Sequence, residues 1–175
     1  SYLFSSPLIW GIAGAVSLAV TAYAEQQDLG GPTKCSFMSL YAAVGIILGN
    51  IISPRLAPHR YSASLLSGIS LMILIICIPV FVETGLSHVH KPQELYFPLA
   101  VYVGFVGFFF GVCSNLIDAE YLQRVGNDGK EGTGAALHSF CIAVFAFLIC
   151  AIVGLSILNG WMDAISQFIL LSLLL

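Results

Sequence analysis

The chain has 175 residues, of which 58% are hydrophobic and only 9% are charged, and its formal net charge is −3. Soluble domains carry about 25% charged residues, and a chain of this size cannot hide so much apolar surface in a water-facing fold. The composition therefore excludes a soluble globular domain and predicts an all-α, polytopic transmembrane helix bundle. The sequence shows no basic patch, so we expect no nucleic-acid partner.

Six apolar stretches approach the length of about 20 residues that a membrane-spanning helix needs. They are longer than ordinary strands and lack period-two alternation, which favours helices over a β-barrel. Pro54 is expected to end the second helix. The first and last stretches reach the chain ends, so we expect a fragment of a longer protein. The prediction is one transmembrane domain over residues 1–175, with helices near 3–24, 36–53, 61–82, 96–117, 134–158 and 161–175.

The loops between the predicted helices differ in charge. The second and fourth loops hold all three arginines, whereas the first and third loops hold single lysines among acidic residues. The positive-inside rule then places the N-terminus and the even-numbered loops in the cytoplasm. The residues that we expect to form a cytoplasmic gating loop are Arg55, Arg60, Arg124 and Asp128.

Small residues mark expected helix contacts. Glycines four apart form a groove that lets two helix backbones approach closely. The second predicted helix contains Gly45 and Gly49, and the fourth contains Gly107 and Gly111. We expect these four glycines to lie at helix–helix interfaces, either as static packing or as faces that slide during a transport cycle.

Sequence motifs for catalysis or metal binding do not occur. The chain has no hydrolase elbow, P-loop, dinucleotide fingerprint or zinc-protease HExxH motif. Its five cysteines form no CxxC pair, and His88 and His90 offer two metal ligands at most. We therefore expect no enzyme, no cofactor and no metal site, and we interpret the cysteines as small apolar packing residues.

The most polar stretch follows the fourth predicted helix, from Asn115 to Ser139. Asp118 and Glu120 are functional candidates because carboxylates at membrane depth are costly unless they face water or a partner. On a helix Asn115 shares a face with Asp118, and Glu120 stands four residues before Arg124 as a possible ion pair. The alternative is that both acids lie at the membrane interface and simply end the helix.

His138 lies near the start of the fifth predicted helix. It is a candidate proton relay, since histidine changes charge near neutral pH. The plainer interpretation is a hydrogen bond to a neighbouring helix. Trp10 and Trp161 suit interfacial anchoring, with Trp10 also a candidate cavity wall. The residues predicted to contact a substrate are Asp118, Asn115, Glu120, His138, Trp10 and Gln123.

Two levels of resemblance support a transporter. Six spans with a basic loop after the second resemble one half of a major facilitator transporter, and the run from Gly49 to Arg60 resembles that superfamily's glycine-to-arginine loop. Residues 123–132, with the following Ala135, Ala136 and Phe140, are similar to the helix-ten-to-eleven loop of bacterial lysophospholipid transporters. Those transporters occur alone or fused ahead of an acyltransferase for 2-acylglycerophosphoethanolamine.

Further short stretches carry the same resemblance, and some positions depart from it. Trp10, Gly11, Gly14 and the run Leu29-Gly30-Gly31 look like that family's seventh helix and following loop, and the run from Gly45 to Arg55 looks like its eighth helix. The chain lacks the acidic residue before the loop arginine, the usual proline near Ile117 and the paired asparagines, where it has His138 and Ser139. These departures concern the substrate more than the fold.

The resemblance implies the C-terminal half of a carrier that flips lysophospholipid across a bacterial inner membrane. The implied partners are the lipid bilayer, an amphiphilic small-molecule substrate, and either a missing N-terminal six-helix half or a second copy. The echo of Gly11-Ile12-Ala13-Gly14 in Gly104-Phe105-Val106-Gly107 fits two inverted three-helix repeats. Two alternatives stay open: a carrier of this fold for another solute, such as a drug or peptide, and a non-transporting structural or assembly subunit of a membrane complex.

Overall fold

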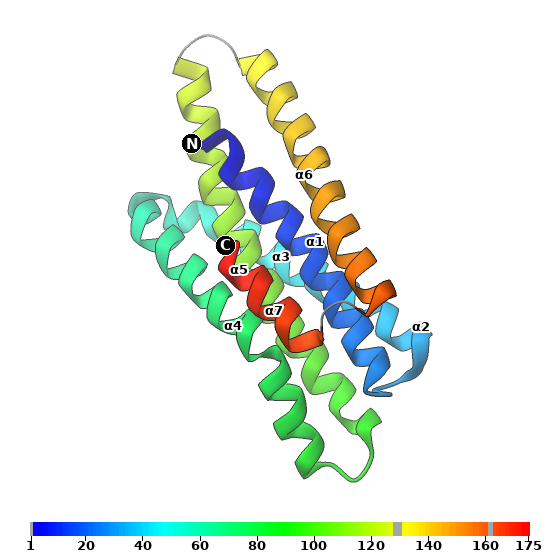
Figure 1. Ribbon diagram of the computed structural model, residues 1–175. Helices are drawn as coiled ribbons and strands as arrows, with labels where there is room; N and C mark the ends of the chain where they lie inside the picture. Colours follow the sequence, from blue (N-terminus) through cyan, green and yellow to red (C-terminus); the bar gives the residue numbers. More distant parts are fainter. Residues whose placement is uncertain (1, 128–130, 161–162) are drawn as a thin grey trace.

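The computed structural model describes residues 2–127, 131–160 and 163–175, and nearly all of these residues are helical (Figure 1). No strand occurs within those ranges. The long helices are α1 (Tyr2–Gln26), α3 (Met38–Leu56), α4 (Arg60–His88), α5 (Tyr96–Asn127) and α6 (Glu131–Asn159). The shorter elements are α2 (Gly31–Ser36), α7 (Ala164–Leu173) and the 3-10 turns η1 (Ala57–His59) and η2 (Pro92–Leu95).

Five helices are long and apolar enough to cross a membrane. Helix α7 has 10 residues in the structure. At 1.5 Å per residue it covers about 15 Å, roughly half of a bilayer core. The described chain therefore contains five helices of spanning length and one short helix, where six spans were predicted. The five segments are Ser6–Gln26, Thr33–Leu56, Tyr61–His88, Pro92–Gln123 and Gly132–Asn159.

Helix α3 continues through Pro54, so the expectation that this proline ends the helix was wrong. A proline removes one hydrogen bond to the carbonyl four residues earlier, here that of Asn50. The Ser53 hydroxyl donates to the same carbonyl at 3.1 Å and replaces the lost bond. The helix then ends at Leu56, within one turn of the proline.

Helix α5 extends ten residues beyond its predicted end and stops at Asn127. The extension is rich in Ala, Glu, Leu, Gln and Arg, which are strong helix formers. Asp118 and Glu120 consequently lie inside the helix, and the interpretation that these acids simply end it was wrong.

The helices pack in a pattern that repeats. The most extensive contacts join α3 to α5 and α1 to α6, followed by α4 with α5, α4 with α7, α1 with α5 and α1 with α7. If α1, α3 and α4 are exchanged for α5, α6 and α7, the pairs α4–α7 and α1–α5 are unchanged, and each of the other pairs becomes another pair of the same set. Figure 1 shows α1 and α5, the first helix of each group, running in opposite directions. The chain thus contains two inverted groups of three helices.

The pair α3 and α5 is the closest helix contact, and the two predicted glycine motifs form it from both sides. A Cβ atom added at Gly45 or Gly49 would come closer than 3.0 Å to the backbone oxygen of Gly104 or Phe108. A Cβ atom at Gly107 or Gly111 would collide in the same way with the backbone of Ala42 or Ile46 on α3. The two backbones are therefore in direct contact, and no side chain can be inserted between them unless a helix moves.

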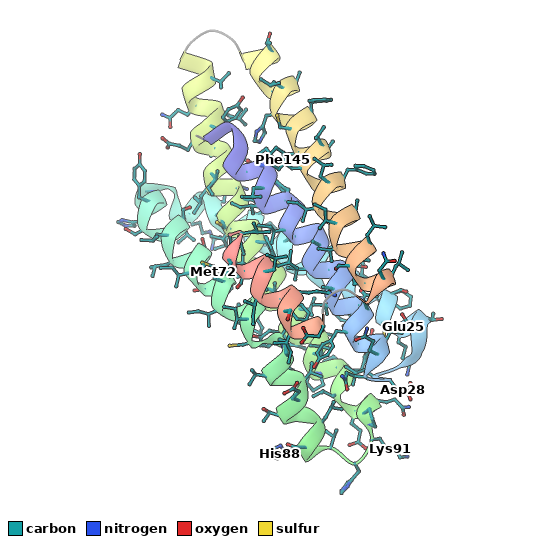
Figure 2. The ribbon with its side chains drawn as sticks, in the orientation of Figure 1. Glu25, Asp28, Met72, His88, Lys91 and Phe145 are labelled. Carbon is teal, nitrogen blue, oxygen red and sulfur yellow. The ribbon has the colours of Figure 1, made fainter. Side chains whose placement is uncertain are left out.

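The pair α1 and α6 is packed through side chains instead. A Cβ atom at Gly11 would lie 2.6 Å from Cδ1 of Ile149 and 3.1 Å from the backbone oxygen of Phe145. A Cβ atom at Gly14 would lie 2.9 Å from Sγ of Cys150. Figure 2 shows Phe145 on α6 where that helix runs beside α1. This interface can adjust by side-chain rotation, which the α3–α5 interface cannot.

Candidate functional site

A polar cluster joins α1, α5 and α6 near one end of the bundle. One carboxylate oxygen, Oδ1 of Asp118 on α5, accepts a hydrogen bond from the Ser6 hydroxyl on α1. The same oxygen accepts a second bond from Nε2 of His138 on α6, at 3.1 Å. Ser6 is completely buried, and the side chains of His138 and Asp118 are 8% and 27% exposed. The carboxylate is thus held by donors from two other helices, while part of it still reaches the surface.

The antiparallel packing of the helices places these three residues at one level. In Figure 1 the start of α1 lies beside the C-terminal half of α5, and α6 runs back alongside α1. Ser6 is close to the start of α1, His138 is two turns into α6, and Asp118 is nine residues before the end of α5. Three positions that are far apart in the sequence therefore meet between the helices.

Tyr121 fixes the orientation of the imidazole. Its ring stacks on the ring of His138, with centroids 4.6 Å apart and an interplanar angle of 22°. Its hydroxyl donates to the backbone oxygen of Gly134 at 3.1 Å, one turn before His138 on α6. A Cβ atom at Gly134 would collide with Val125, so α5 and α6 are also close here. These contacts keep Nε2 of His138 aimed at Asp118.

The second ring nitrogen of the histidine is buried. Among the described residues Nδ1 of His138 has no hydrogen-bond partner. When Nε2 donates to Asp118, a neutral imidazole carries a lone pair on Nδ1. A buried polar atom without a partner costs free energy, about 1–3 kcal/mol. Nδ1 is therefore an acceptor available to a water molecule, a proton or a substrate group.

The same three residue types make up hydrolase triads, but the arrangement here differs. In a triad the serine donates to the histidine, which takes up its proton, and the aspartate binds the far side of the ring. Here Ser6 and His138 both donate to Asp118, so the histidine is not placed to activate the serine. The geometry favours charge binding or a helix latch over nucleophilic catalysis.

Two predicted residues, Asp118 and His138, meet directly in the structure. Two others lie about one helical turn from the cluster along their own helices: Asn115 on α5 and Trp10 on α1, both half-buried. Glu120 is buried at 8% exposure, whereas Gln123 is exposed. The predicted set therefore splits into a central pair, two flanking residues, one further buried residue and one exposed residue.

The predicted gating residues are only partly described. Arg55 is exposed in the last turn of α3. The side chains of Arg60 and Arg124 lie outside the described residues, as do Asp128 and Trp161. The predicted ion pair of Glu120 with Arg124 therefore stays a prediction.

The other charged residues of interest lie at the far end. Figure 2 shows Glu25 and Asp28 at the end of α1, and His88 and Lys91 where α4 leads into α5, all at the lower end of the bundle. In the part of the chain that the structure describes, no three His, Cys, Asp or Glu side chains gather as a possible metal site.

Ser6 was not predicted from the sequence. A serine in an apolar helix usually bonds to its own backbone, so its presence alone points to no site. The neighbouring Pro7 likewise does not indicate a functional site. Only the packing of the start of α1 against α5 reveals the contact with Asp118.

Comparison of the chain with protein-family models, curated proteins and solved structures gives no match. A functional assignment therefore depends on the arrangement of the helices and on the polar cluster.

Proposed function

We propose that the chain is one half of a membrane carrier of the major facilitator type, and that the carrier flips an amphiphilic lipid, a lysophospholipid, across the bilayer. The observation that carries the proposal is the exchange pattern of the helix contacts. Two inverted groups of three helices are the internal repeat of each half of such carriers, which bind substrate between the halves near the midplane.

The glycine positions support the same repeat. Gly11 and Gly14 on α1 recur with the same spacing as Gly104 and Gly107 on α5. The α1 glycines face α6, and the α5 glycines face α3. In both cases the first helix of one group packs against the second helix of the other. A sequence echo and a contact pattern, which are separate observations, thus support one internal symmetry.

The lining of the bundle supports an amphiphile. The cavity between α1, α3, α4 and α5 has apolar walls apart from Ser17 and room for only about 20 Å³, roughly one water molecule. It offers none of the polar groups that would replace the water around a sugar. A more open groove of about 300 Å³ runs between α1, α4 and α5 at the level of the cluster.

This groove has the features needed for an acyl chain. Its walls are mostly apolar, with Ser64 and Cys113 among them, and Ile9 and Ile117 in its lining are close in sequence to Ser6 and Asp118. A lipid whose headgroup contacts the partly exposed carboxylate of Asp118 has an apolar surface at the same level for its chain. The charged cluster and the apolar groove together match the two parts of a lysophospholipid.

The test is a flipping assay with the full-length gene product in vesicles that contain fluorescent lysophospholipid. The wild-type protein should move the label between leaflets, and Asp118→Asn should abolish most of this movement because the charge at the cluster is lost. Asp28→Asn, which changes an exposed aspartate at the opposite end, should flip lipid like wild type. If the wild-type protein flips no lysophospholipid but moves a drug or peptide, the proposed carrier type is retained and the proposed substrate is wrong.

If the gene encodes no further spans and the protein neither dimerises nor transports, these results would instead favour the structural or assembly subunit.

A further inference from the structure

We infer that Asp118 and His138 together bind a coupling proton, and that this proton controls the attachment of α1 to the α5–α6 hairpin. The inference rests on the proposed function, because it names the ion that drives the carrier. It begins from the convergence of two donors, from two helices, on one carboxylate oxygen.

The pair lies inside two of the apolar segments, toward one end of each. Asp118 is five residues inside the end of the segment Pro92–Gln123, and His138 is six residues inside the start of Gly132–Asn159. At 1.5 Å per residue these positions are about 7–9 Å from the segment ends. With His138 neutral, the cluster carries one negative charge. One proton bound by the pair makes the cluster neutral.

The structure provides one accessible group for that proton. The two hydrogen bonds occupy Oδ1 of Asp118, so the partly exposed side chain can take a proton from water on Oδ2. Uptake forms an O–H bond on the carboxyl group, and the hydronium ion that delivers the proton leaves as water. Nε2 of His138 keeps its own proton and continues to donate to Oδ1, so the protonated pair is neutral overall.

Other ionisable groups near the pair come from few elements. On α5 these groups are Cys113, Glu120 and Tyr121, and on α6 the nearest is Cys141. Helix α1 has no ionisable side chain between Ser6 and Ala22, α4 has Arg60, Tyr61 and Cys77 before Glu83, and α7 has none. The side chains of Arg60, Arg124 and Glu131, and residues 128–130, lie outside the described part. Asp118 and His138 are the carboxylate–imidazole pair for which the described residues show a direct contact.

Protonation changes the contact with α1. Hydrogen bonds to an ionised carboxylate are roughly twice as strong as neutral ones. Neutralising Asp118 weakens the bond that Ser6 donates, and this bond ties α1 to α5 at this end. At the α1–α6 interface the atoms nearest the α1 glycines are mainly side-chain atoms, which can change rotamer. Proton uptake therefore weakens the tie of α1 to α5 and leaves the α3–α5 contact in place.

At the opposite end of the bundle a hydrogen bond joins α5 to α2, and it does not depend on the charge of Asp118. The Tyr96 hydroxyl, at the start of α5, donates to the backbone oxygen of Lys34 on α2 at 2.9 Å. Its acceptor is a neutral carbonyl, so protonation of Asp118 does not act on this bond.

The first arm of the test measures proton binding directly and needs no substrate. Infrared difference spectra of the purified full-length protein, taken between neutral and acidic pH, should contain the carbonyl band of a protonated carboxylic acid in a low-polarity site. The band should vanish in Asp118→Asn and persist in Asp28→Asn. In Ser6→Ala, which keeps the carboxylate, the band should shift because one hydrogen bond is lost. A band that stays unchanged in Asp118→Asn overturns the inference.

The second arm measures coupling in vesicles. A pH gradient of one unit should change the distribution of lysophospholipid between leaflets by about tenfold if one proton moves with each lipid. If lysophospholipid is flipped equally with and without the pH gradient, the proposal of a carrier stands and the coupling proton is refuted. Absence of flipping, together with a band that depends on Asp118, would refute the carrier and retain the proton-binding pair.

Discussion

The two interfaces that the internal symmetry makes equivalent, α3 with α5 and α1 with α6, are built differently. At α3–α5 the glycine motifs of both helices bring backbone against backbone, so an added Cβ atom meets carbonyl oxygens. At α1–α6 the atoms nearest the α1 glycines belong mainly to Ile149 and Cys150, and a Cβ atom added at Gly154 on α6 meets only the side chain of Leu18, at 3.6 Å. Backbone atoms cannot move aside alone, whereas side chains can change rotamer.

This difference separates a fixed half of the bundle from an adjustable one. The polar cluster joins the adjustable pair, because Ser6 and His138 come from α1 and α6. Small shifts of packed helices are a common way for proteins to switch between two states. We therefore expect α3 and α5 to move as one body, and α1 to change its position relative to α5 and α6.

The largest effect should follow from Gly45→Ala. The new methyl group would collide with the backbone of Gly104, and overpacking that no rotamer relieves should cost about 3 kcal/mol or more. The measurement is unfolding of the purified protein in mixed micelles, followed by loss of helicity. Gly68→Ala is the matched control, since no atom lies within 4 Å of a Cβ atom added there. Equal stability of the two variants would contradict direct backbone contact.

Ser6→Ala should have the next largest effect. It removes a buried hydrogen bond to a carboxylate, a type of bond that contributes about 1.5–3 kcal/mol. The loss should be largest near neutral pH, where the Asp118 carboxylate is charged, and should shrink in acid as that charge disappears. Unfolding curves at several pH values would show this. A cost that is equal at all pH values would separate the Ser6 contact from the charge of Asp118.

Several features could be predicted from the sequence, because composition and local spacing determine them. The apolar runs predicted an all-helical chain with helices of spanning length, and the structure has this character. The spacing of Gly45 and Gly49 indicated a helix interface, but it did not identify α5 as the partner. The Pro54 prediction failed because a serine hydroxyl replaces the missing donor, a compensation that depends on side-chain geometry.

The cluster could be predicted only in part. Asp118 and His138 stand out because charged or titratable groups are rare in this chain, yet nothing in their separation of 20 residues indicates a direct bond. The extension of α5 to Asn127 sets their common level, whereas the apolar run predicted that the helix ends near Ile117, ten residues earlier. Ser6 has no such rarity, since serines occur in most of the helices. Its role depends on a contact between positions 112 residues apart.

A smaller effect is expected for Gly11→Ala. The added methyl group meets Cδ1 of Ile149, the flexible end of a side chain, and the backbone oxygen of Phe145 at 3.1 Å. The overpacking is partly offset by the better helix propensity of alanine, so a net loss of about 1 kcal/mol is expected. The control is Gly154→Ala on α6, where the new contact, with Leu18, is an ordinary 3.6 Å. A loss as large as that of Gly45→Ala would show that both interfaces are equally rigid.

The smallest effect should come from Tyr96→Phe. The phenylalanine ring keeps the edge-on contact with Tyr41, whose centroid lies 6.5 Å away, and loses the hydroxyl that donates to the backbone oxygen of Lys34 and also bonds to the side chain of Tyr41. The bond to Lys34 is exposed and its acceptor is neutral, so its removal should cost about 0.5 kcal/mol. Unlike the cost of Ser6→Ala, this cost should not change between neutral and acidic pH. A pH dependence seen for Tyr96→Phe would mean that acid weakens the whole bundle and that Asp118 has no special part in it.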